Sequence, residues 1–273
     1  MRKVNVGVIQ VCCNSDFDKN LSKAEAYIKK AANMGADIVV LPENICYIGS
    51  EGTVTGFAQN NNGQKAIDFF SRVAQENKIY IVAGTIPIPV SERNLKVFSR
   101  SIIFGSDGNI IHQYDKIHLF DVAVKKKATY TESNYIEAGA LDGLKVVELP
   151  FGKVATLVCF DLRFPEAFHQ LAQQGAEIIF LPAAFTEFTG QYHWETLLRA
   201  RAVDNQLYIA ASNQTGEHIP GRFSWGHSMM VDPWGTVVDS LQKEEGVLVT
   251  EIDLNDIYNR REQFPIFKAH KLQ

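Results

Sequence analysis

Cysteine is scarce in this sequence, and its spacing suits no cross-link. The 273 residues include four cysteines, and they form neither a CxxC pair nor a zinc-like combination with histidine. This usage argues against a disulfide-stabilised secreted scaffold and against a structural zinc site. We expect a reduced, cytoplasmic protein that uses no metal and no other cofactor.

Long apolar runs are missing as well. The longest, Ile178 to Phe185, is broken by Pro182, and it is far shorter than the ~20 residues that cross a bilayer. The first residues are too few and too polar, with Asn5 and Gln10, for a secretory signal. We therefore expect no membrane partner.

A surplus of positive charge is also absent. Lysine and arginine number 27 against 31 aspartates and glutamates, a net charge of −4 with histidine neutral, so nothing predicts nucleic acid as a partner. Hydrophobic residues make up 46% and charged residues 21% of the chain, which is ordinary for a globular protein. Because no linker, repeat or shift in composition divides the chain, we predict a single domain over 1–273.

What the sequence does contain is an alternation of helices and strands. Apolar residues recur at helical spacing in some segments and form β-branched runs in others. Turn residues such as Gly105–Asn109, Pro150–Gly152 and Asp232–Gly235 join neighbouring runs into hairpins. A purely parallel sheet does not predict so many hairpins, so the pattern favours a mixed sheet, or two stacked sheets with helices outside. The expected helices are 18–34, 65–75, 165–173, 194–204 and 254–261, and the loosest stretch is 123–143.

Reactive side chains follow three of the expected strands. Glu43, Lys116 and Cys159 each come just after a buried apolar run. In open α/β sheets the functional site lies beyond the carboxyl ends of the strands. Taken singly, each has an ordinary interpretation: Glu43 as a charge at a helix start, Lys116 as a solvated lysine and Cys159 as a buried thiol. Their shared position at strand ends favours a site built around a nucleophilic cysteine.

Three segments carry a resemblance to a known family. Leu41–Asn44, Tyr114–Leu119 and Val158–Glu166 are similar, in the same order, to the signature segments of the nitrilase superfamily, the carbon–nitrogen hydrolases. The resemblance extends over nearly the whole chain. It implies an α/β fold in four layers, an α-β-β-α sandwich with two mixed sheets, which pairs into a homodimer or a larger homo-oligomer.

The resemblance also implies a catalytic triad of Glu43, Lys116 and Cys159, with Glu132 as a second glutamate in the loop after the lysine. Free cysteine is mostly thiol at neutral pH, so Glu43 is needed as a general base to form the attacking thiolate. Lys116, with a backbone N–H near Phe160, stabilises the oxyanion of the tetrahedral intermediate. Glu43 then protonates the departing ammonia, and water hydrolyses the thioester left on Cys159. The expected role of Glu132 is to orient Lys116 or to assist proton transfer.

His118 offers a competing mechanism. Side chains two apart on an extended segment share a face, so His118 is expected to reach the same pocket as Lys116. There it would act as the base for Cys159 in a thiol-protease-like dyad. The alternatives are that it lines the substrate or has a structural role.

The pocket wall is expected from residues near the cysteine and from the loop Pro182–Gly190, for which an ordinary connecting loop is the alternative. Arg163 and Glu166 are three apart at a helix start and are expected to fix the turn as well. Arg199 and Arg201 face different sides of a helix, so at most one enters the pocket. The lysines at 125–127 are solvated or draw an anionic substrate. The predicted substrate-binding residues are His118, Phe160, Arg163, Phe185, Thr186, His193 and Arg199.

Further segments narrow the resemblance within the family. Thr189–Glu195 and Leu198–Ala202 look like the branch that contains deaminated glutathione amidase and omega-amidase, while Thr131–Asn134 and Gly226–Gly235 look closer to the former. This implies a metabolite-repair amidase acting on the terminal amide of a small carboxylated substrate, an α-keto-glutaramyl compound. The lysine-rich segment 122–130 departs from the family pattern. The alternatives are an omega-amidase on α-ketoglutaramate, a hydrolase of nitriles or N-carbamoyl compounds, and a non-catalytic binding subunit.

Overall fold

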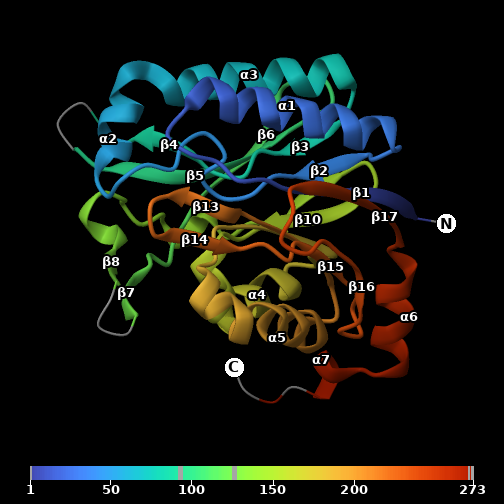
Figure 1. Ribbon diagram of the computed structural model, residues 1–273. Coiled ribbons are helices and arrows are strands. Elements are labelled where there is room, and N and C mark those ends of the chain that lie inside the picture. The colour runs from blue at the N-terminus through green and yellow to red at the C-terminus, as the bar shows by residue number, and fades with distance from the viewer. Residues whose placement is uncertain (1, 92–94, 125–127, 270, 272–273) are drawn as a thin grey trace.

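Four layers make up the molecule, as Figure 1 shows. This is a computed structural model that describes residues 2–91, 95–124, 128–269 and 271. Two sheets lie face to face; α1 (Phe17–Asn33) and α3 (Gly63–Asn77) cover one sheet, and α4 (Pro165–Gln173) and α5 (Glu187–Asn205) cover the other. The prediction of an α-β-β-α sandwich is confirmed.

The first sheet is mixed. Its strand order is β17-β1-β2-β3-β5-β4, with β6 also paired to β5. The pairs β1–β2 and β2–β3 are parallel, and the other pairs in this sheet are antiparallel. The strands are β1 (Lys3–Gln10), β2 (Ile38–Val40), β3 (Tyr80–Val82), β4 (Ile86–Pro89), β5 (Val97–Phe104), β6 (Ile110–Asp115) and β17 (Gly246–Asp253).

The second sheet repeats this design with the order β16-β15-β12-β11-β10-β9. Its three central strands run parallel, and the flanking pairs are antiparallel. The hairpins expected from turn residues are present as β5–β6, β9–β10 and β15–β16. The strands are β9 (Val147–Leu149), β10 (Gly152–Thr156), β11 (Ile178–Ala183), β12 (Tyr208–Asn213), β15 (Met229–Val231) and β16 (Val237–Ser240).

Alternation along the strands explains how one sheet serves two cores. Successive side chains of a strand point to opposite faces. Ile38 and Val40 therefore join the apolar cluster between the two sheets, whereas Val39 and Leu41 join the cluster beneath α1 and α3. A strand buried on both faces has no polar side to show, which is why it reads as a continuous apolar run. A third cluster fills the space between the second sheet and α4 and α5.

Several helix boundaries differ from expectation because capping decides them. The helix expected from 194 begins at Glu187, where Thr186 accepts a hydrogen bond from the Thr189 N–H at 3.3 Å. Helix α1 is capped by Asp16, which was not foreseen, through a 3.1 Å hydrogen bond from the Lys19 N–H. The remaining helices are α2 (Thr53–Phe57), α6 (Asn255–Gln263) and α7 (Ile266–Ala269). No helix in the described ranges is both long and apolar enough to cross a membrane.

Two small hairpins lie outside the main sheets. The stretch 123–143, expected to be loose, includes the end of β7 (Asp121–Val124) and all of β8 (Ala128–Thr131), which form one hairpin. A second hairpin is formed by β13 (Thr215–Ile219) and β14 (Arg222–Trp225). Both lie at the same side of the molecule in Figure 1. The lysines at 125–127, considered above for an anionic substrate, lie outside the described residues.

Candidate active site

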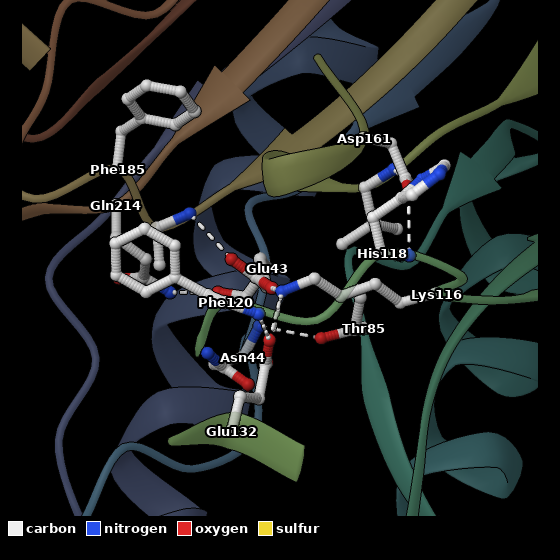
Figure 2. Close-up of polar contacts among 12 residues, drawn as sticks. Glu43, Asn44, Thr85, Lys116, His118, Phe120, Glu132, Asp161, Phe185 and Gln214 are labelled. Carbon is white, nitrogen blue, oxygen red and sulfur yellow. Dashed lines mark hydrogen bonds and ion pairs between the residues drawn. The ribbon is translucent and has the colours of Figure 1, made fainter. Parts of the chain in front are cut away.

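Three strand ends converge on one cleft. Glu43 follows β2, Lys116 follows β6, and Cys159 follows β10. All three line an open cleft of about 610 Å³, a volume that includes space open to solvent. Figure 2 shows the Lys116 side chain between two carboxylates, with Nζ 2.8 Å from Glu43 Oε1 and 2.8 Å from Glu132 Oε2. The structure thus brings together the four residues predicted to be catalytic.

The turn that carries the cysteine holds an unusual backbone. Cys159 begins a short 3₁₀ helix and has φ of 46°, in the left-handed region that disfavours residues with a Cβ. Such a conformation persists only where its surroundings hold it. Buried Asp161 does so: one carboxylate oxygen accepts hydrogen bonds from the Val158 N–H and the Tyr114 hydroxyl, both at 2.8 Å. The other accepts from the N–H of His118 at 3.1 Å and lies 2.7 Å from its Nδ1.

Lys116 is fully enclosed, with 1% of its surface exposed. Burial alone would lower the pKa of its ammonium, but the carboxylates of Glu132 and Glu43 raise that pKa well above its ordinary value. Glu132 is in turn fixed by the Phe120 N–H, which donates to Oε2 at 2.7 Å. Burial raises the pKa of Glu132, and Lys116 opposes that rise. The lysine is therefore a fixed positive charge at neutral pH.

Glu43 is held on more than one side. Oε2 accepts a hydrogen bond from the Ala184 N–H at 2.9 Å, while Oε1 faces Lys116. Its backbone carbonyl accepts from Gln214 Nε2 at 2.9 Å. The next residue, Asn44, has φ of 59° and donates its N–H to Thr85. This carboxylate therefore has little freedom to leave the cleft.

Cys159 is buried, with 7% of the residue exposed. Burial raises its pKa well above the ordinary value, nearby Glu43 raises it further, and Lys116 partly offsets both. The thiol is therefore protonated at neutral pH until a base removes its proton. Glu43 is the carboxylate beside it.

The cleft walls include four of the predicted substrate-binding residues, Phe160, Arg163, Phe185 and Thr186. The turn at the start of α5 contributes to the wall, as expected for Pro182–Gly190. Two further lining residues, Ala184 and Thr189, belong to that loop, and Tyr130 belongs to the segment 122–130 considered above. Sequence reasoning did not single out the other lining residues, which are Asn44, Phe120, Tyr135, Arg222, Phe223 and Ser224.

His118 requires a correction, because it does not line the cleft. Its Nδ1 is 2.7 Å from Asp161 Oδ1, and its ring stacks on Phe164 with centroids 3.6 Å apart. The expected sharing of a face with Lys116 fails because β6 ends at Asp115, so strand alternation stops before the histidine. Its contacts fit a positioning role rather than that of a substrate ligand or a base for the thiol.

His193 and Arg199 are corrected as well, because neither lines the cleft. His193 is exposed on α5, and its Nδ1 lies 3.2 Å from Arg163 Nη2. Arg199 turns away and donates to the Gly235 carbonyl at 2.8 Å. Arg201 also stays outside the cleft, but its Nε donates to the Leu162 carbonyl at 3.1 Å and so supports the cysteine turn.

Two guanidinium groups of the cleft have no anionic partner among the residues that the structure describes. Within the described part of the chain, no carboxylate lies at ion-pair distance from Arg163 or Arg222, although both line the cleft. Arg163 lies over the rings of Phe160 and Phe185, at 5.6 and 5.3 Å. The carboxylates that line the cleft are those of Glu43 and Glu132, and both form ion pairs with Lys116. The cleft therefore has positive charge to offer an anion, although the chain as a whole carries −4.

Comparison with known proteins places the chain in a family. The family model for carbon–nitrogen hydrolases matches residues 5–262, so the chain belongs to that family. An omega-amidase NIT2 of Mus musculus is 37% identical over 273 residues, which cover 99% of this chain and 96% of that protein. A deaminated glutathione amidase of Yersinia enterocolitica is 35% identical over 272 residues, covering 99% of this chain and 94% of that protein.

A solved structure agrees with these matches. The crystal structure of Saccharomyces cerevisiae Nit3, a member of branch 10 of the nitrilase superfamily, matches with a TM-score of 0.87 and 29% identity, over 99% of this chain and 97% of that chain. The predictions of a nitrilase-superfamily fold and of a carbon–nitrogen hydrolase of the amidase type are confirmed. Among the described residues, no group of three or more His, Cys, Asp or Glu side chains is arranged to hold a metal ion.

Proposed function

We propose that Cys159, Glu43 and Lys116 are the catalytic residues of this amidase and that its substrate is a small carboxylated amide, deaminated glutathione or a related α-keto-glutaramyl compound. One observation carries the proposal. A buried thiol beside the Glu43–Lys116 pair shares a cleft with Arg163, a half-buried guanidinium without a carboxylate partner among the described residues.

The first step forms the acyl-enzyme. Glu43 accepts the proton of the Cys159 thiol, and the sulfur attacks the amide carbonyl to give a tetrahedral oxyanion. The raised pKa of the thiol makes this proton transfer necessary, since little thiolate exists at neutral pH without a base. The Ala184 N–H keeps the second oxygen of Glu43 in place while its first oxygen faces Lys116.

Lys116 stabilises the oxyanion. Its ammonium has three N–H groups, and at rest it contacts Glu43 Oε1 and both oxygens of Glu132. When Glu132 keeps one of these hydrogen bonds, the third N–H is released for the substrate oxygen. The first N–H groups of the 3₁₀ helix after Cys159, that of Phe160 in particular, lack a partner within the helix and supply a second donor.

The second step releases the acid. Glu43, now protonated, gives its proton to the leaving nitrogen as the C–N bond breaks, and the acyl group remains on Cys159 as a thioester. Glu43 then removes a proton from water, which attacks the thioester carbonyl. Collapse of that intermediate returns the proton to sulfur and frees the carboxylic acid. One water is consumed, and one amine or ammonia and one acid are formed.

Arg163 binds the substrate carboxylate. Burial lowers the pKa of its guanidinium, which means that the charged form is incompletely solvated in the resting cleft. A bound carboxylate restores that lost stabilisation through paired N–H···O contacts. Since Arg163 is four residues beyond Cys159 on the same short turn, it fixes a carboxylate at a set distance from the nucleophile.

A substrate panel tests the proposal. Wild-type protein is assayed for ammonia, amine and acid release from carboxylated α-keto amides, simple amides, nitriles and N-carbamoyl amino acids. We expect the highest kcat/KM for the carboxylated α-keto amides, and a hydroxylamine-trapped acyl group confirms turnover through an acyl-enzyme. Preference for a nitrile or an N-carbamoyl compound would reject the substrate class, and absence of any trapped acyl group would leave a non-catalytic binding subunit.

A second candidate, omega-amidase activity on α-ketoglutaramate, has equal support from the relatives. The mouse omega-amidase and the bacterial deaminated glutathione amidase match this chain at 37% and 35% identity. Both substrates present the same acyl half to Arg163 and Cys159. They differ in the leaving group, which is ammonia from α-ketoglutaramate.

The setting proposed for the enzyme is a cytoplasmic homodimer or larger homo-oligomer. A reducing compartment suits the mechanism because oxidation of Cys159 would remove the nucleophile. Large apolar side chains such as Tyr192, Trp234 and Phe264 are exposed in the single chain, and apolar surface of this kind favours association between copies. Sedimentation of the purified protein tests the assembly.

A further inference from the structure

The hairpin β13–β14 carries a histidine and a serine that contact each other across its two strands. The register of the pair shifts between Glu217 and Ile219, and His218 is the extra residue of this β-bulge. A bulge changes the direction in which a side chain points. Both His218 and Ser224 are buried, and His218 Nε2 lies 2.8 Å from Ser224 Oγ. The bulge thus places the imidazole ring against the serine hydroxyl.

The direction of this hydrogen bond follows from the other nitrogen of the imidazole ring. His218 Nδ1 lies 2.7 Å from the Cys13 carbonyl oxygen, which only accepts hydrogen bonds, so Nδ1 carries the ring hydrogen. Burial lowers the pKa of His218 to about 4, so at neutral pH the ring is neutral and Nε2 carries no hydrogen. The Ser224 hydroxyl is therefore the donor to Nε2.

This arrangement decides what Ser224 offers to the catalytic cleft, which it lines. A hydroxyl group has one hydrogen and two acceptor lone pairs. The hydrogen is used by His218, and no side chain among the described residues donates a hydrogen bond to Oγ. The two carboxylates of the cleft are in contrast engaged by Lys116. Ser224 therefore presents a free acceptor, and no donor, to a bound molecule.

Backbone contacts place Ser224 on the side of the cleft where the proposed general base is held. Ser224 forms an isolated antiparallel bridge with Thr186. Ala184, two residues before Thr186, donates its N–H to Glu43 Oε2 at 2.9 Å. One short segment of chain therefore connects the serine with Glu43, the residue that protonates the leaving nitrogen in the proposed mechanism.

The proposed substrates share one donor that such an acceptor can bind. Their carboxylate and ketone oxygens only accept hydrogen bonds. The scissile amide nitrogen, in contrast, carries two hydrogens in a primary amide and one in a secondary amide. The group that matches an acceptor on the Glu43 side of the cleft is therefore the N–H of the amide that is cleaved.

We propose, on the basis of the proposed function, that Ser224 is a further catalytic residue, which accepts a hydrogen bond from the N–H of the scissile amide, and that His218 is the positioning residue that keeps this serine an acceptor. After the sulfur attacks, the nitrogen becomes tetrahedral, and its lone pair must face Glu43 to receive the proton. Holding one N–H at Ser224 fixes the rotation about the C–N bond and directs that lone pair. Ser224 exchanges no atom with the substrate.

The test compares amides with an ester of the same acyl half. The amides are α-ketoglutaramate and the secondary amide of its acyl half with a dipeptide, and the ester is the corresponding methyl ester, whose leaving oxygen carries no hydrogen. In Ser224→Ala we expect kcat/KM for both amides to fall by about 10-fold, the upper range for one hydrogen bond. Turnover of the ester should stay within about 2-fold of wild type. The ester thereby reports an intact fold and nucleophile.

Three further variants locate the effect on the amide-to-ester ratio of kcat/KM. Ser224→Thr keeps a hydroxyl group and should retain most of the ratio. His218→Asn keeps a donor for the Cys13 carbonyl but is too short to accept from Ser224, so the hydroxyl hydrogen is free to turn into the cleft and the ratio should fall. Ser240→Ala removes an exposed serine of β16 that does not line the cleft, and it should change nothing.

Equal losses for amides and ester in Ser224→Ala would overturn the proposed role, because a purely structural serine affects both kinds of substrate. So would an amide-to-ester ratio that this variant leaves unchanged. If Ser224→Ala does not fold, His218→Asn decides by the same ratio. In each case turnover of the amides by the wild type keeps the proposed function. Failure of the wild type to hydrolyse either amide would instead overturn the proposed function and, with it, this inference.

Discussion

The strand-end cluster (Glu43, Lys116 and Cys159) and the rim hairpins (β7–β8 and β13–β14) surround the same cleft but are built differently. Glu43 and Cys159 stand at the ends of buried strands and Lys116 at the end of the more exposed β6, and atoms of the cluster make short hydrogen bonds to one another and to the backbone. The rim hairpins form separate two-stranded sheets, and β14 has one isolated bridge, between Ser224 and Thr186. The proposed catalytic groups therefore stand at strand ends of the main sheets, and the rim hairpins supply other walls of the cleft.

This difference has a physical basis. A general base and an oxyanion donor act only from fixed positions, because errors of about an ångström cost large factors in rate. Contacts to a distant part of the substrate tolerate more variation and are supplied by loops. Changes in the strand-end cluster are thus expected to reduce turnover of every substrate, and changes in the rim hairpins to alter the choice of substrate.

The largest effect is expected from Cys159→Ala. Without sulfur no thioester forms, so kcat should fall by about 10⁴-fold or more for all substrates. Cys159→Ser should also lose most activity. Steady-state assays of product release provide the measurement, with Cys12→Ala, a cysteine that does not line the cleft, as the control that keeps activity. Near-normal turnover by either Cys159 variant would refute the nucleophile.

Glu43→Gln keeps the shape of the side chain but removes the base. We expect kcat/KM to fall by about 10³-fold. Because burial and Glu43 hold the thiol pKa high in the wild type, alkylation of Cys159 should rise with pH. At neutral pH the rate should be lower in the variant, because loss of the base that removes the thiol proton outweighs the lower thiol pKa that follows removal of the Glu43 charge. The control is Glu137→Gln, which removes a carboxylate paired with Lys96 at 3.3 Å and should leave kcat/KM unchanged. Undiminished alkylation at Cys159 would contradict the assignment.

Lys116→Ala tests the oxyanion role and the electrostatics together. Loss of this donor should reduce kcat by about 10²–10³-fold with little change in KM. The variant also leaves Glu43 and Glu132 without their shared cation, so we expect a cost of about 3–5 kcal/mol in the free energy of unfolding. Kinetics and thermal unfolding measure the two effects. Lys243→Ala, which removes an exposed ion pair with Glu187, should change neither. A change in KM alone would argue against the oxyanion role.

The smallest effect is expected from Arg199→Ala. Its Nε donates to the Gly235 carbonyl and its side chain does not line the cleft, so kcat/KM should stay within about 2-fold for every substrate, as for a surface change. Kinetics on the same panel measure this. A selective loss for carboxylated substrates would restore Arg199 as a binding residue.

The strand-end cluster was predictable because its signals are local. The strands before Glu43 and Cys159 are buried and read as apolar runs, and a reactive residue just past such a run marks the sheet edge where sites form. Strand β6, before Lys116, is largely exposed, so the segment Tyr114–Leu119 rather than burial identified that lysine. The mixed character of the sheets was predictable for the same reason, because hairpin turns are marked by local turn residues. The helix boundaries depended on capping residues. Thr186 caps α5, so the helix begins earlier than apolar periodicity in the sequence indicates.

The rim was not predictable for the opposite reason. Arg222 and Ser224 lie in a short hairpin that belongs to neither main sheet, so no apolar pattern ties them to the cleft. His118 was misplaced because alternation was extended past the end of β6. Arg199 was misplaced because helical phase matters: Trp194, Leu198 and Arg201 are buried while Arg199 faces outward.

The most direct test is to identify the residue that carries the acyl group during turnover. Wild-type protein is mixed with a carboxylated α-keto amide, quenched in acid within the first turnovers, and analysed by intact mass and peptide mapping. The account predicts an added mass equal to the acyl half, located on Cys159 and removed by hydroxylamine. Turnover without an adduct on Cys159, or with the adduct on Cys12, Cys13 or Cys46, would contradict it.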